Sequence, residues 1–116
     1  MELHCTFNIQ LADTNEAQQF ATDICSARGY APVQMSTVPY WKIEGQQQVR
    51  LVLPLYAGLS LEEAIAEVQR IAVGIAPQGW GDTGPDTDDE VVYEMVLDLM
   101  EQEGALKWTH LQLVIE

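Results

Sequence analysis

Both ends of the chain alternate apolar and polar residues strictly, and this pattern constrains the fold more than any other feature. Residues 2–11, ELHCTFNIQL, place one apolar set on a single face: Leu3, Cys5, Phe7, Ile9 and Leu11. Residues 107–116, KWTHLQLVIE, alternate in the same way, with Thr109, Leu111, Leu113 and Ile115 opposite Trp108, His110, Gln112 and Val114. Alternation with a period of two predicts strands that have one buried side and one solvent-facing side. We therefore expect a sheet whose two faces differ in polarity.

Three segments carry the signal of a helix start, in which a capping residue precedes a glutamate by three positions. The pairs are Asp13 (or the adjacent Thr14) with Glu16, Ser60 with Glu63, and Thr87 with Glu90. The first two pairs open apolar stripes with helical spacing. The sequence predicts that the first helix ends at Gly29, that the second stops at Pro77, and that the third covers residues 88–103.

Two further strands are expected at residues 33–43 and 48–56, joined by a turn at 44–46. Pro39 indicates that the earlier strand lies on a sheet edge. The order of elements resembles a ferredoxin-like split βαβ sandwich, β-α-β-β-α-[α]-β, within the α+β class. This resemblance implies helices packed on one face of a four-stranded, mainly antiparallel sheet with the first and third strands central. We expect a single domain, 1–116, in which an acidic Gly-rich loop at 78–87 leads into the extra helix.

Charge narrows the classes of partner. Eighteen acidic residues against five basic ones give a formal net charge of −13. This balance disfavours nucleic acids and anionic membranes, and it favours a cationic partner or simply solubility. The chain has no run of about 20 apolar residues and begins without a basic signal-peptide segment. We expect a cytoplasmic protein in which Cys5 and Cys25 are buried, reduced and unpaired.

The stretch GWGDTG at residues 79–84 matches the spacing of a dinucleotide-binding loop. A phosphate loop must follow a strand and open a helix directly, whereas here a predicted helix comes before it and acids crowd the site. We therefore expect no nucleotide there. An EF-hand is excluded because Val91 and Leu97 occupy the positions of its glycine and glutamate. A looser calcium site stays open as an alternative, formed by Asp82, Asp86, Asp88 and Asp89. His4 and His110 lack metal-ligand spacing, so we expect surface histidines and no metal or cofactor.

On a helical wheel, the predicted helix 88–103 carries an acidic stripe and, beside it, an apolar flank of Tyr93, Leu97 and Met100. Either the helix is deeply buried in the fold, or this flank contacts a partner. These features, together with Trp80 between two glycines, predict a binding surface for a cationic protein. The expected contact residues are Trp80, Asp82, Asp86, Asp88, Asp89, Glu90, Tyr93, Glu94, Leu97, Asp98, Met100 and Glu101. In size and charge the chain resembles bacterial immunity proteins, the antitoxin-type inhibitors that cover a toxin.

Alternatives stay open beside this interpretation. Carboxylates that imitate phosphates would make the chain a nucleic-acid mimic, such as an anti-CRISPR protein. A ferredoxin-like domain could instead bind a small ligand on its open sheet face, through Thr6, Asn8, Arg50, Tyr56, Trp108 and His110. A small hydrolase or transferase is a fourth possibility, but no catalytic motif is present, so we expect no enzyme. We expect a monomer or a weak dimer.

Overall fold

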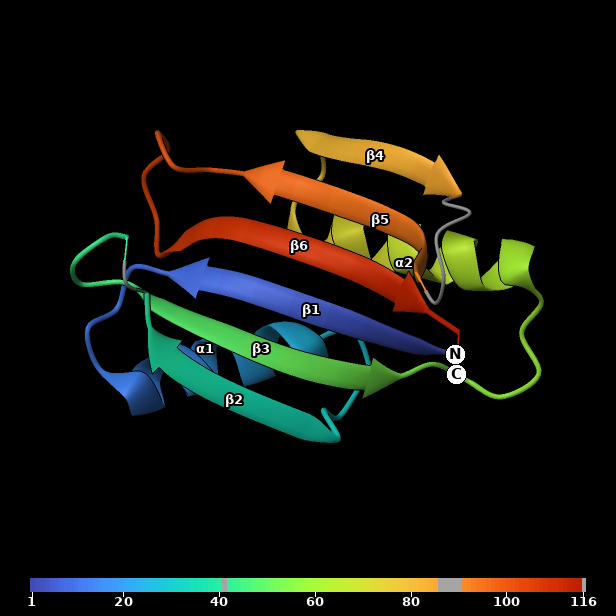
Figure 1. Ribbon diagram of the computed structural model, residues 1–116, viewed down its shortest axis with the longest axis horizontal. Helices are drawn as coiled ribbons and strands as arrows, with labels where there is room; N and C mark the ends of the chain where they lie inside the picture. The colour runs from blue at the N-terminus through green and yellow to red at the C-terminus, as the bar shows by residue number, and fades with distance from the viewer. Residues whose placement is uncertain (41, 86–90, 116) are drawn as a thin grey trace.

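The computed structural model describes residues 1–40, 42–85 and 91–115. Within these ranges an α+β fold contains two helices and a six-stranded antiparallel sheet. Across the sheet the strands run in the order β2-β3-β1-β6-β5-β4 (Figure 1). The elements in chain order are β1 (Glu2–Ile9), α1 (Thr14–Ser26), β2 (Gln34–Pro39), β3 (Gln47–Pro54), α2 (Leu61–Ile75), β4 (Trp80–Pro85), β5 (Val91–Asp98) and β6 (Leu106–Val114).

Side chains cap the starts of α1 and α2, as the sequence predicts. Asp13 accepts a hydrogen bond from the backbone N–H of Glu16 at 3.0 Å. At α2 the box is reciprocal: Ser60 accepts from the Glu63 N–H, and the Glu63 carboxylate accepts from the Ser60 N–H. Each cap satisfies backbone donors that a helix start leaves without a partner. These local signals fix where both helices begin.

Both helices cover the same face of the sheet (Figure 1). α1 packs behind β2 and β3, and α2 packs behind β6. The apolar sides of the strands turn toward the helices and form the core, which includes Leu3, Phe7, Val49, Leu111 and Leu113, each at most 1 % exposed. The opposite face of the sheet has no helix over it among the described residues, so the polar half of each alternating strand is left there.

The sequence predicts one end of the sheet correctly and the other end incorrectly. Pro39 closes β2, which is an edge strand, and Gly45 takes a positive φ of 82° in the turn that leads to β3, so both expectations are confirmed. The helix predicted over 88–103 is wrong, because residues 91–98 form β5 and residues 99–104 form a turn. Much of the loop predicted at 78–87 is strand β4. The sheet consequently exceeds the four strands expected.

The reason for the error lies in the register of β5. Tyr93, Met95 and Leu97 alternate with Glu94, Val96 and Asp98, so the first set turns toward the helices. A spacing of four residues puts Glu94 and Asp98 on one side of a strand as well as of a helix, because four is a multiple of two and close to 3.6. Pairing with β6 and β4 satisfies the backbone on both sides, and these long-range partners decide the outcome.

Of the described helices, none is long and apolar enough to cross a membrane.

Candidate functional site: the open face of the sheet

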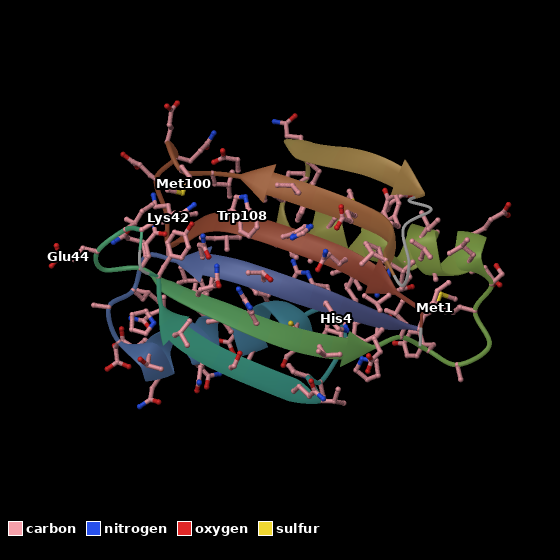
Figure 2. All side chains as sticks on the ribbon, in the orientation of Figure 1. Met1, His4, Lys42, Glu44, Met100 and Trp108 are labelled. Atoms are coloured by element: carbon pink, nitrogen blue, oxygen red, sulfur yellow. The ribbon has the colours of Figure 1, made fainter. Side chains whose placement is uncertain are left out.

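Strand register arranges the polar residues of the open face in rows. Thr6 on β1 is paired with Arg50 on β3 and with His110 on β6. On either side of this central row, the same three strands contribute Gln48, Asn8 and Trp108, and then Val52, His4 and Gln112. Side chains opposite each other on adjacent strands stand about 5 Å apart. The open face, which is turned toward the viewer in Figure 2, is therefore a regular array of mainly polar side chains on paired strands.

The open face is hollowed. A cavity of about 590 Å³ lies over β2, β3, β1 and β6, and its lining includes His4, Thr6, Arg50, Trp108 and His110. This volume falls in the range of about 300–1,000 Å³ that is usual for small-ligand pockets. Val52, at 9 % exposed, is an apolar patch in its floor.

A second hollow, of about 250 Å³, adjoins the first at one end of the sheet. Gln48 and Trp108 line both hollows. The remaining lining of the smaller one is Asn8, Tyr40, Lys42, Ile43 and Met100. Figure 2 shows Lys42, Met100 and Trp108 gathered at this end, while His4 lies toward the other end of the face. The smaller hollow is richer in aromatic and aliphatic side chains, so the two together form one depression with an apolar end and a polar end.

The charge of this lining is opposite to that of the chain. The linings include Arg50 and Lys42, two of the five basic residues, and both histidines. Among the described residues, no aspartate or glutamate lines either hollow, although the sequence contains eighteen. Glu94 lies on the same face beside His110, so the two hollows, rather than the whole face, are where a negatively charged group meets least repulsion.

Amide side chains hold Arg50 in place. The Arg50 Nε donates to the Gln48 Oε1 at 3.1 Å, and the Gln48 Nε2 donates to the Asn8 Oδ1 at 3.1 Å. Asn8 is only 4 % exposed and so anchors this relay. Within the described residues, the terminal nitrogens of the guanidinium form no hydrogen bond, and Arg50 lines the cavity, so these nitrogens remain as donors for a ligand.

A second network orients the aromatic side of the face. Glu94 on β5 accepts a hydrogen bond from the Gln112 amide at 2.7 Å, and its Oε1 lies 3.4 Å from the His110 Nε2. The His110 ring lies 5.6 Å from the Trp108 ring, centroid to centroid, at a tilt of 54°. The contacts with Glu94 and Trp108 restrain the imidazole, so the site offers preset donors, acceptors and an aromatic surface.

The contact surface predicted on the loop and helix between Trp80 and Glu101 loses two of its apolar anchors. Tyr93 and Leu97 are 1 % and 0 % exposed, so for these two the alternative of burial in the core holds, whereas Met100 is exposed. Trp80 is half-buried against the core, and its indole N–H lies 3.0 Å from both the Ala72 and the Ala76 carbonyl oxygens. Tyr93 donates its hydroxyl hydrogen to Asp82 and accepts from the Gln69 amide at 3.1 Å. These side chains connect β4 and β5 to α2.

The acidic residues of the predicted contact surface lie in different parts of the structure. Asp82 is exposed on edge strand β4, whereas Glu94 turns to the open face. Asp98, Met100 and Glu101 are exposed at the end of β5 and in the turn after it. Asp86, Asp88, Asp89 and Glu90 lie outside the described residues, and with them most of the looser calcium site. The described residues contain no cluster of three or more acidic, histidine or cysteine ligands suited to a metal ion.

Sequence reasoning found part of the open face. Thr6, Asn8, Arg50, Trp108 and His110 lie there together, as the small-ligand alternative expected. Tyr56 does not, because it is exposed beside Tyr30, with ring centroids 5.3 Å apart. Gln48 and His4 were missed, although alternation along their strands could have found them. Tyr40, Lys42 and Met100 come from turns, and no local pattern in the sequence indicates that these turns lie close together.

Comparisons with protein-family models, curated proteins and solved structures gave no match to the chain.

Proposed function

We propose that the protein is a non-enzymatic binding protein that holds a small ligand on the open face of its sheet. One observation carries this proposal: in a chain of net charge −13, the two hollows of the open face are lined by cationic, amide and aromatic side chains and, within the described residues, by no carboxylate. A solubility requirement alone would place acids on every exposed face. The arrangement of fixed donors around a concave surface is typical of ligand sites.

Equilibrium dialysis against a small-molecule extract of cells tests this proposal, with bound compounds identified by mass spectrometry. The wild-type protein should retain one or a few compounds, and Trp108→Ala should lose them. Tyr56→Ala is the matched control, since it removes an exposed aromatic ring away from both hollows. Retention that is equal in all three proteins, or absent from the wild type, would refute a ligand site on this face.

A second candidate keeps the acidic surface as its basis: an immunity-type inhibitor of a cationic protein. Asp98, Glu101 and Glu103 are exposed around the turn after β5, and this crowding of charge favours steering of a basic partner. The product of the neighbouring reading frame is the first partner to test. Asp98→Lys combined with Glu101→Lys should slow association and flatten its salt dependence. An unchanged association rate across a salt series would remove this candidate.

We also propose that β2, β3, β1 and β6, together with α1 and α2, form a ferredoxin-like unit to which β4 and β5 add a hairpin. The strand order β2-β3-β1-β6 supports this assignment. A cytoplasmic location is proposed as well, because Cys5 and Cys25 are buried as free thiols, which suits a reducing compartment.

A further inference from the structure

Arg50 differs from the other arginines in what holds it. On the helix side Arg70 forms an ion pair with Glu67, its Nε lying 2.7 Å from the Glu67 Oε1. Arg28 donates to the Ile24 carbonyl oxygen at 3.0 Å. Arg50 is oriented by the neutral amide of Gln48, and within the described residues no carboxylate neutralises it. A planar guanidinium with free terminal donors matches the geometry of a carboxylate or phosphate group. Among the described residues, Arg28 likewise forms no ion pair, but of these two arginines only Arg50 lines the cavity.

Trp108 provides the second contact. It lies where the two hollows meet, and the smaller hollow beside it is lined by Tyr40, Ile43 and Met100. Indole rings bind flat aromatic groups by offset or edge-to-face stacking. Lys42 also lines this hollow, but most of its side chains are aromatic or aliphatic, so this end of the depression favours the ring of a ligand.

The spacing between the two contacts limits the ligand. Trp108 is paired with Asn8, and Arg50 is paired with Thr6, two residues along β1 on the same face. Two strand spacings across the sheet and two residues along it separate their Cα atoms by about 12 Å. Both side chains line the same depression and extend from the sheet, so a ligand can contact both if its anionic group is attached to the ring directly or through a few bonds. Thr6 and His110 lie between them and offer polar groups to the connecting atoms.

We propose that the ligand is an aromatic anion, whose ring packs on Trp108 and whose carboxylate or phosphate group binds Arg50. This assignment rests on the function proposed above and adds the chemical class of the ligand. Gln48 acts as a positioning residue, because its side-chain oxygen accepts the hydrogen bond from the Arg50 Nε while its amide nitrogen is held by Asn8.

Four probes test the class by titration followed through backbone amide NMR shifts. The probes are 2-naphthoate, 2-naphthyl phosphate, the neutral isostere 2-naphthamide, and cyclohexanecarboxylate, which keeps the charge without an aromatic ring. The two aromatic anions should shift the amides of Thr6, Arg50 and Trp108. The better of them should bind at least about tenfold more tightly than 2-naphthamide, because a charge-assisted hydrogen bond is lost with the charge. The stronger of the two distinguishes a carboxylate ligand from a phosphate ligand.

Variants test whether Arg50 is the residue that favours the aromatic anions over the neutral 2-naphthamide. Arg50→Gln should bind the aromatic anions and 2-naphthamide equally, while Arg50→Lys should keep part of the preference. Arg70→Gln removes a cation on the helix side and should leave all affinities unchanged. Equal binding of 2-naphthoate, 2-naphthyl phosphate and 2-naphthamide by the wild type would overturn the anionic class while leaving a ligand site on this face. Tighter binding of cyclohexanecarboxylate than of 2-naphthoate would overturn the aromatic class. Failure of every probe to shift the open face at millimolar concentration would overturn both proposals.

Discussion

The two faces of the sheet are built from alternate residues of the same strands, yet different interactions hold them. On the helix side, apolar side chains such as Phe7 and Leu111 are removed from water, and burial of this kind is the dominant stabilising term in folding. On the open side, neighbours such as Asn8 and Gln48 form hydrogen bonds that exchange for bonds to water and contribute little net stability. The helix side therefore determines whether the chain folds, and the open side is available for binding.

The largest expected contrast comes from adjacent residues on β1. Phe7→Ala empties a fully buried site, which should lower the free energy of unfolding by about 3–5 kcal/mol. Thr6→Ala, one residue away on the open face, should lower it by less than about 1 kcal/mol. Urea denaturation of both variants measures the difference. Similar losses for the two substitutions would mean that the faces do not divide their roles in this way.

Trp80 and Trp108 provide a smaller contrast of the same kind. Trp80→Phe removes the indole N–H that lies near the Ala72 and Ala76 carbonyl oxygens, and we expect a loss of about 1–3 kcal/mol. Trp108→Phe should cost less stability, and it should weaken ligand binding instead. Thermal denaturation of both variants provides the comparison. If Trp108→Phe is the more destabilising change, the open face is part of the stabilising core.

Removing the Tyr93 hydroxyl group tests how much its hydrogen bonds stabilise the β4–β5 hairpin. Tyr93→Phe keeps the buried ring but breaks the bridge from Gln69 to Asp82, so we expect a loss of about 1 kcal/mol. Burial, with a smaller contribution from the Asp82 hydrogen bond, raises the pKa of the Tyr93 hydroxyl. The neutral form is therefore favoured in the folded state, and its stabilising contribution is lost as the pH rises above the ordinary tyrosine pKa of about 10. In Tyr93→Phe the stability should fall less steeply over this alkaline range, as measured by denaturation at several pH values.

The smallest effect concerns the thiols. Burial raises the pKa of Cys25 to about 11, with a smaller opposing effect of Arg28, and burial raises the pKa of Cys5 as well. Because the folded-state pKa lies above the ordinary value, stability is full below pH 9 and falls as the pH rises toward 11. Between pH 7 and pH 9.5 we expect Cys25 to account for a loss of about 1 kcal/mol or less, which Cys25→Ala should remove. Both thiols should react slowly with a thiol reagent in the native protein, and rapid labelling at neutral pH would contradict their burial.

The accuracy of sequence reasoning differed between the two halves of the sheet for a physical reason. In β1, α1 and α2 the local signals agree: strict alternation, a capping aspartate at Asp13 and a capping box at Ser60. In β5 they conflict, since Glu94, Met95 and Leu97 are good helix formers in a segment that pairs as a strand. The alternation of Tyr93, Met95 and Leu97 with the residues between them also fits a strand. The backbone pairing of β5 with β6 and β4 decides between the two local preferences. The wrong element in turn placed Tyr93 and Leu97 on a surface.

For the candidate site, too, some residues could be predicted from the sequence and others could not. Residues on β1, β3 and β6 could be assigned to the open face, because alternation along a strand fixes the side on which each residue lies. Lys42 and Met100 come from separate turns that meet at one end of the sheet, and their proximity depends on strand order. The hydrogen-bond relay from Asn8 through Gln48 to Arg50 depends in addition on the register between β1 and β3.

The pairing of β1 with β6 has a consequence for the order of events in folding. β1 is synthesised first of all the strands, and its second neighbour in the sheet is the last. During translation β1 can pair with β3, but the edge of β1 that faces β6 stays unpaired until residues 106–114 have left the ribosome. Contacts between segments so distant in sequence carry a large loop-closure entropy and slow the folding reaction. A nascent chain halted before β6 would expose both the unpaired edge of β1 and the apolar residues beneath it, which makes that intermediate a substrate for chaperones.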